Sequence, residues 1–177
     1  MIETPFRFEA ILPPEKLQRI ALLSLRWSLI EHIIGNCLRV MLNLSEKEAE
    51  TRVFKLSLHN RMEEMKELAK QRPLNPKAKA AFDELMPIMS GIKELRNHVA
   101  HAIIVDDKLH SRREQSSYGL DQIISAEDLT KYAGHLVIAL RDALGSKDYP
   151  PGTEPGPLPE RPDIPSSLVD LFSSPNE

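Results

Sequence analysis

The sequence predicts an all-α protein, a bundle of four to five helices with a short loop or hairpin insertion and a proline-rich C-terminal tail. Apolar residues recur at helical spacing through most of the chain, which has 177 residues, 41% of them hydrophobic. Eight of the 14 prolines lie within the last 29 residues, where neither a helix nor the interior of a sheet can form. We therefore expect one folded helical region followed by a non-globular segment.

The first helix is expected over residues 14–44, because charges are sparse there and no proline follows Pro14. Two apolar stripes run along it. They comprise Leu17, Ile20, Trp27, Ile34, Leu38 and Met41, and Leu22, Leu25, Leu29, Ile33 and Val40. More than one face of this helix must then be covered, as in a central bundle helix or a helix shared with a second subunit.

The next helical segment begins at a capping box. The side chain of Ser45 and that of Glu48 can each accept a hydrogen bond from the other residue's backbone N–H. Helical sequence continues to about Gln71, with a break expected near residues 58–60.

A further helix is predicted to begin at Asn75 and Pro76, which supply a cap and a first-turn proline, and to end near His101. Pro87 lies inside this segment. Because proline lacks the backbone N–H, we expect a kink at that position.

Beyond this helix, the β-branched residues 103–105 end the helical pattern, and residues 106–124 read as a polar loop or short hairpin. Residues 125–128 resemble a second N-terminal cap. Leucines at helical spacing then carry the last helix to Gly145.

The predicted organisation is a helical domain over residues 1–146 and a proline-rich, largely extended or disordered tail over residues 147–177. The tail has one apolar cluster, at residues 168–172. This cluster could dock on the body, on a partner chain, or nowhere.

Charge and cysteine content exclude some functional classes. The net charge of −3 means that overall charge would not hold a nucleic acid, so binding one would need a local basic cleft. The single cysteine, Cys37, excludes an internal disulfide and is expected to be an inert buried thiol. No apolar run reaches the ~20 residues of a membrane span and no signal peptide is visible, so a cytoplasmic protein without membrane contact is expected.

Most motifs of catalytic sites are missing, including a glycine-rich phosphate loop and any cluster with metal-ligand spacing, so we expect no cofactor and no metal. One segment reads as a site: Leu95 to His101, at the end of a predicted helix and just before a loop.

On an ideal helix, Arg96 lies about 40° from Ile92, inside an apolar stripe, whereas Asn97 and His101 share the polar edge. His101 lies about 140° from Arg96. One pocket can hold both side chains if the helix end unwinds, if the arginine wraps around, or if a two-fold axis brings in a second chain. Alternatively, Arg96 forms an internal salt bridge with Glu31 and His101 only caps the helix.

The segment Arg96-Asn97-His98-Val99-Ala100-His101 resembles the Arg-x4-His motif of the HEPN superfamily of small helical proteins, especially the subgroup ending in Arg-Asn-x-x-Ala-His. Residues 27–31 are similar to the Trp-x-x-x-Glu of that group, and Leu56-Ser57 before Arg61-Met62 suits its middle helices. The resemblance covers residues 17–144. The glycine that commonly follows the motif histidine is Ala102 here.

This resemblance implies a homodimer whose two motifs meet in one cleft and, in active members, metal-independent cleavage of RNA. By carry-over, His101 would be a general base or acid, Arg96 would hold the scissile phosphate, and Asn97 would orient either group. Glu31 and Trp27 would support the site structurally.

Weaker candidates surround the motif. His98 is either exposed or touches substrate. Lys108, Arg112 and Arg113 form a basic cluster that could contact phosphates or could be a solvated loop.

Two functions stay open from the sequence. One is a dimeric HEPN-type endoribonuclease, such as a toxin or antiviral effector, with an antitoxin as a possible protein partner. The other is a catalytically inactive HEPN-like dimer that binds nucleotide, RNA or a partner protein.

Overall fold

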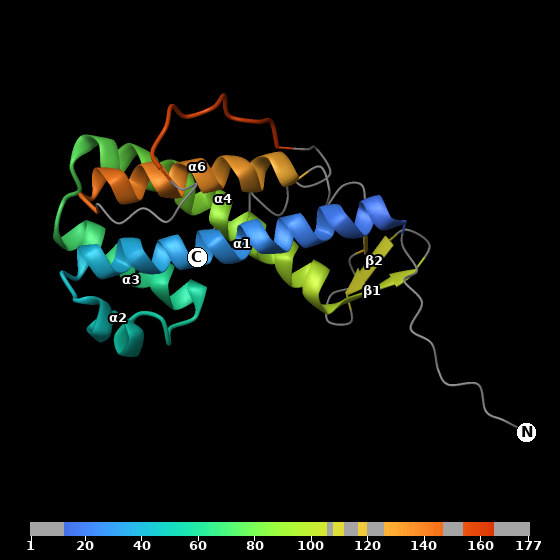
Figure 1. The fold of residues 1–177 in the computed structure, drawn as a ribbon, viewed down its shortest axis with the longest axis horizontal. Coiled ribbons are helices and arrows are strands. Elements are labelled where there is room, and N and C mark those ends of the chain that lie inside the picture. Colours follow the sequence, from blue (N-terminus) through green and yellow to red (C-terminus); the bar gives the residue numbers. More distant parts are fainter. Residues whose placement is uncertain (1–12, 106–107, 112–116, 120–125, 147–153, 165–177) are drawn as a thin grey trace, which may run out of the picture.

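The computed structural model describes residues 13–105, 108–111, 117–119, 126–146 and 154–164, and between residues 98 and 119 it describes the backbone alone. Figure 1 shows a bundle of helices with a small sheet at one end. The helices are α1 (Pro14–Met41), α2 (Glu46–Arg52), α3 (Leu58–Gln71), α4 (Pro76–His101) and α6 (Glu127–Ala143), and the strands are β1 (Ala102–Val105), β2 (Lys108–Ser111) and β3 (Ser117–Gly119). The predicted all-α bundle with an insertion is confirmed at this level.

Local capping signals set several helix boundaries, as predicted. The hydroxyl of Ser45 accepts a hydrogen bond from the N–H of Glu48, whose carboxylate accepts one from the N–H of Ser45, so the capping box is complete. The break falls over residues 53–57, so its predicted position at residues 58–60 is wrong; these residues form the first turn of α3, which Ser57 caps. Each of these serines therefore marks the N-terminus of the helix that follows it.

Helix α4 carries the motif and begins where the sequence indicates. The side chain of Asn75 accepts a hydrogen bond from the N–H of Ala78 at 2.9 Å, which caps the first turn. Pro87 lies inside α4, and the element continues as one helix to His101.

Helix α6 begins close to the predicted position. Its N-cap is Ala126, which has helical dihedrals and makes no side-chain cap, and the predicted cap residue Ser125 lies outside the described residues. The acidic residue Glu127 at the first position of α6 pairs with Arg26 and Arg19 of α1. A carboxylate there also favours the positive end of the helix dipole.

The end of α6 follows the prediction. Gly145 has a φ of +86°, and the N–H groups of Gly145 and Ser146 donate to the carbonyls of Asp142 and Arg141. This pattern is a Schellman motif, which needs a residue that tolerates the left-handed conformation.

The insertion between α4 and α6 is a three-stranded antiparallel sheet in the order β1, β2, β3. In the β1–β2 pair, Ile103 lies opposite His110 and Ile104 opposite Leu109. The expected hairpin is therefore present, and β3 adds a strand that the sequence did not predict.

The core lies where α6 packs along both α4 and α1, the three helices that run through the middle of the bundle in Figure 1. Its most buried side chains include Ile30, Ile34 and Leu38 of α1, Leu85, Met89 and Ile92 of α4, and Leu136, Val137 and Leu140 of α6. Among the described residues, no helix is both long enough and apolar enough to cross a membrane.

The described part of the tail is extended, and an ion pair links it to the bundle. The guanidinium of Arg161 lies 3.8 Å from the carboxylate of Glu84, which also accepts a hydrogen bond from the hydroxyl of Tyr132. Exposed ion pairs of this kind contribute about 0–1 kcal/mol.

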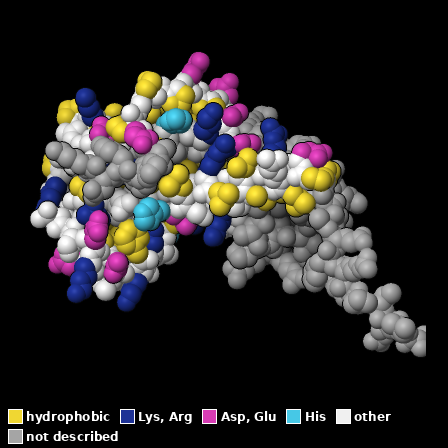
Figure 2. All heavy atoms as spheres, in the orientation of Figure 1, with side chains coloured by type: hydrophobic (Ala, Val, Ile, Leu, Met, Phe, Trp, Pro, Cys, Tyr) yellow, Lys and Arg dark blue, Asp and Glu magenta, His cyan; other side chains and the backbone are white. Residues whose placement is uncertain are grey.

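The two apolar stripes of α1 differ in how far their side chains are buried. In the first stripe, Trp27, Ile34 and Leu38 are buried, Ile20 and Met41 are half-buried, and Leu17 is 39% exposed. In the second, Leu22, Leu25 and Leu29 are 37%, 67% and 42% exposed. Hydrophobic side chains accordingly lie open along α1 in Figure 2. The expectation that both faces are covered is wrong for these three leucines within one chain.

The single cysteine yields the first test. Cys37 is fully buried in α1. Burial raises the pKa of its thiol to about 12, and the charge of Arg141 opposes this only in part. The thiol pKa of the unfolded chain is about 8.5. Between that pH and the folded-state pKa, the folded protein therefore keeps the thiol proton and the unfolded chain loses it.

We predict that this thiol adds no pH dependence below about pH 8 and that its contribution to stability falls above about pH 9, by up to about 1.4 kcal/mol per pH unit. Urea unfolding of the wild type and Cys37→Ala at pH 7.5 to 10.5 measures the effect as the difference between the two slopes. Parallel pH profiles for the two proteins would contradict the prediction.

Candidate functional site

A cleft of about 340 Å³ opens where α1, the start of α3 and the last turns of α4 meet. Among the described residues, its lining is Trp27 and Glu31 of α1, Leu56, Ser57, Leu58, His59 and Arg61 around the start of α3, and Lys93, Arg96 and Asn97 of α4. The cleft thus joins the Arg-Asn part of the motif to a segment more than 30 residues away in the sequence.

The lining of this cleft is basic although the chain is acidic. It contains three cationic side chains, Arg61, Lys93 and Arg96, besides His59, against the single carboxylate of Glu31. The ammonium of Lys93 also lies 3.3 Å from the carboxylate of Glu94. A chain with a net charge of −3 therefore has the local basic cleft that an anionic ligand would need.

Arg61 holds the walls of the cleft together. Its guanidinium donates hydrogen bonds to three backbone carbonyls: Glu31 at 3.1 Å, Val53 at 3.2 Å and Phe54 at 3.1 Å. It also lies over the ring of Phe54, 5.7 Å from the ring centroid. Burial lowers the pKa of this guanidinium, and the nearby Glu31 carboxylate opposes the shift. An arginine stays charged regardless, so Arg61 contributes both structure and positive potential.

The beginning of α3 faces the same cleft. Ser57 accepts a hydrogen bond from the N–H of Asn60 at 3.2 Å, and the first turn contains no acidic residue. The first N–H groups of a helix and its dipole favour an anion. Leu58 and His59, in that turn, line the cleft, so this end of α3 adds to the positive potential.

Arg96 is exposed, not buried in the apolar stripe as expected, and Asn97 is half-buried. A nitrogen of Arg96 lies 3.4 Å from the side-chain oxygen of Asn97, a long hydrogen bond. Among the described residues, no ion pair joins Arg96 to Glu31, so the expected salt bridge is absent. Since Arg96 sits at the edge of the stripe, its long side chain can lay its methylenes on the apolar surface and keep the charge in water.

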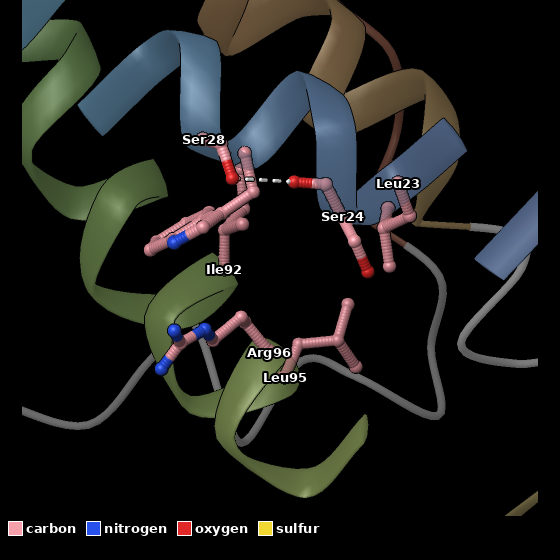
Figure 3. Close-up of a pocket in the computed structure, with 7 residues that line it drawn as sticks. Leu23, Ser24, Ser28, Ile92, Leu95 and Arg96 are labelled. Atoms are coloured by element: carbon pink, nitrogen blue, oxygen red, sulfur yellow. Dashed lines mark hydrogen bonds between the residues drawn. The ribbon is translucent and has the colours of Figure 1, made fainter. Parts of the chain in front are cut away.

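A second pocket, of about 200 Å³, lies between α1 and α4. Figure 3 shows Leu23, Ser24 and Ser28 of α1 facing Ile92, Leu95 and Arg96 of α4 across it, and Trp27 completes the lining. Trp27 and Arg96 line both this pocket and the basic cleft, so the two hollows adjoin.

The remaining predicted site residues are placed less fully. His98 and His101 are in α4 and Lys108 is in β2, but their side chains lie outside the described part, as do Arg112 and Arg113 entirely. The backbone still gives one result. Because α4 stays helical to His101, positions 96 and 101 project about 140° apart, and the helix end does not unwind.

Sequence reasoning missed His59, Arg61 and Lys93 as members of the cleft. Lys93 precedes Arg96 by three residues and Asn97 by four on α4, so helical spacing alone could have found it. His59 and Arg61 reach the cleft only through the turn between α2 and α3, and no local signal in the sequence carries that information.

No group of three or more potential metal-ligating side chains occurs in the described part of the chain. Comparisons of the whole chain with protein-family models, curated proteins and solved structures found no match.

The two arginines of the cleft give opposite predictions for stability. Arg96→Ala should change the free energy of unfolding by less than about 0.5 kcal/mol, because its side chain is exposed. Arg61→Ala should lower it by about 2 kcal/mol or more, since three carbonyls lose their donor. Arg61→Lys should recover only part, because an ammonium cannot reproduce the planar fork.

Urea denaturation of the three variants tests this contrast. Equal losses of unfolding free energy for Arg96→Ala and Arg61→Ala would show that Arg61 contributes no more to stability than Arg96 does.

Proposed function

We propose that this chain forms a HEPN-like homodimer that binds RNA in the basic cleft and cleaves it without a metal. The observation that carries the proposal is the cleft itself: three cationic side chains converge beside Asn97 in a chain whose net charge is negative. RNA phosphates are the abundant anionic groups that such a cleft and an arginine fork suit best.

The helical backbone of α4 favours a site built from two chains. With α4 helical to the end of the motif, a single chain projects positions 96 and 101 in different directions. A two-fold axis beside this helix end would let Arg96 of one chain and His101 of the other act on the same phosphate.

The exposed leucines of α1 supply a surface for that contact. Leu22, Leu25 and Leu29 project within about 60° of one another on a helix, and all three are more than a third exposed. Burying them against a second copy would remove apolar area from water, each fully buried leucine being worth about 1.5–3 kcal/mol. A self-complementary stripe of this kind suits a two-fold interface.

The proposed chemistry is transfer of the phosphoryl group to the ribose 2′-hydroxyl. His101 takes the 2′-hydroxyl proton as a base, or gives a proton to the leaving 5′-oxygen as an acid, because imidazole titrates near neutral pH. The 2′-oxygen bonds to phosphorus and the 5′-oxygen leaves, giving a 2′,3′-cyclic phosphate and a 5′-hydroxyl. Arg96 stabilises the charge that develops on the phosphate oxygens, and Asn97 orients Arg96.

The dimer is tested at the leucine stripe. Leu25→Glu should convert a dimer of the 20.1 kDa chain to a monomer without loss of helical circular dichroism, because Leu25 is 67% exposed in one chain and a charge there would be costly only in an interface. Leu158→Glu, at an exposed leucine of the extended segment over residues 154–164 and not of α1, is the matched control. Light scattering coupled to gel filtration measures the mass, and a monomeric wild type would refute the two-chain site.

Cleavage is tested with single-stranded and transfer RNAs in excess EDTA. His101→Ala and Arg96→Ala should each lower the rate by at least about 100-fold, in the range expected for loss of a proton-transfer group or of a charge-stabilising donor. His135→Ala, a half-buried histidine of α6 that lines neither hollow, should keep the wild-type rate. The products should carry 2′,3′-cyclic phosphate ends.

Equal cleavage by the wild type and His101→Ala would assign the activity to a contaminant. If RNA then bound to the wild type but not to Lys93→Ala, the chain would be a binding version of the same dimer.

A further inference from the structure

We propose that the pocket between α1 and α4 is a nucleobase site, in which one base of a ribonucleotide inserts while its phosphate lies on Arg96 in the adjoining basic cleft. This inference rests on the proposed function and adds to it a substrate-positioning pocket and a base preference.

The size and lining of the pocket indicate a flat, mostly apolar occupant. Its volume of about 200 Å³ is far more than the ~30 Å³ that one water takes in the liquid, and below the ~300 Å³ typical of drug-sized ligands. Leucine, isoleucine and tryptophan side chains form most of the wall, with two serines on one side (Figure 3). A single ring system with polar edges fits this combination.

Arg96 fixes the position of the charged part of the ligand. Its guanidinium borders both hollows, so an anionic group bound there lies directly beside whatever fills the pocket. In a ribonucleotide, the base and the phosphate are joined by one ribose, which matches an apolar pocket next to a cationic cleft. Lys93 and the start of α3 extend the cleft for the next phosphate.

The two serines set a preference among bases. The hydroxyl of Ser24 donates to the carbonyl of Ile20 at 3.0 Å, and that of Ser28 donates to the carbonyl of Ser24 at 3.1 Å. With their hydrogens engaged inside α1, both oxygens face a ligand as acceptors. They therefore favour bases that carry an exocyclic amino group, such as adenine and cytosine, over uracil, which has no amino group and presents carbonyl oxygens at its edge.

The chain provides its own probe of occupancy. Trp27 is its single tryptophan and lines both hollows, so a base entering the pocket should quench the intrinsic fluorescence. The experiment titrates the wild-type protein with AMP, CMP, UMP, ribose 5-phosphate and inorganic phosphate. AMP and CMP should quench Trp27 and bind at least fivefold more tightly than UMP, and at least tenfold more tightly than ribose 5-phosphate.

Variants that fill the pocket distinguish binding of the base from binding of the phosphate. Ser28→Leu should weaken AMP and CMP at least tenfold while leaving ribose 5-phosphate unchanged, and Ser24→Leu is an independent second variant. Ala21→Leu adds a similar side chain to an exposed position of the same helix outside the pocket and should leave every affinity unchanged. Circular dichroism establishes that each variant is folded.

The failures of the two proposals are distinguishable. Equal binding of AMP and ribose 5-phosphate, or unchanged AMP binding by both folded serine variants, would overturn the base pocket and leave the phosphate cleft standing. If no phosphate compound binds the wild type, the proposed function fails as well. Oligoadenylate should displace AMP, and AMP binding without displacement would assign the pocket to a free nucleotide and overturn the RNA assignment.

Discussion

The three hydrogen bonds of the Arg61 guanidinium to backbone carbonyls are the constraint on which the cleft depends. They tie the middle of α1 and the segment that follows α2 to the first turn of α3. Phe54 completes the joint, because its ring lies under Arg61 and stacks on His32 with the two rings 13° from parallel. The ring can approach α1 this closely only because residue 35 is glycine: a Cβ there would lie 2.6 Å from the ring. Backbone hydrogen bonds, aromatic packing and the half-buried charge of Arg61 therefore all fix the same position for the start of α3.

The two arginines of the cleft differ in role: Arg61 holds the structure together, and Arg96 is accessible to a ligand. The guanidinium of Arg61 already donates its hydrogen bonds to backbone carbonyls. It therefore contributes positive electrostatic potential but few direct hydrogen bonds to a substrate. Arg96 is exposed, and it makes a long hydrogen bond to its neighbour Asn97. A guanidinium in water can exchange its hydrating molecules for phosphate oxygens without first breaking a strong internal pair. The expected salt bridge to Glu31 would have made that exchange costly, so its absence suits a ligand-binding role better than a structural one.

Features of the fold that depend on local chemistry could be predicted from the sequence. The capping box at Ser45, the asparagine cap before α4 and the glycine that ends α6 each act within one turn, and the structure has all three. The features that could not be predicted involve longer range. Glu127 pairs with Arg26 and Arg19 of α1, across about 100 residues of sequence. Arg96 has the helical phase of a buried residue yet is exposed, because burial depends on which neighbouring element reaches that end of α4. His59 and Arg61 enter the cleft for the same non-local reason.

Helix α1 links the proposed dimer to the proposed site, because the face of α1 that lines the pocket is next to the face that carries the exposed leucines. On a helical projection, Ser28 lies about 60° from Leu25 and about 100° from Leu29. The pocket sector therefore borders the exposed leucine stripe on the same helix. A second copy seated on the stripe would come to lie beside the pocket, and hence beside Arg96, which is where the proposed two-chain site needs a residue from another chain. The stripe, the pocket and the cleft then form one continuous surface, and loss of the dimer should remove the catalytic histidine from the phosphate while leaving the nucleobase pocket, built within one chain, intact.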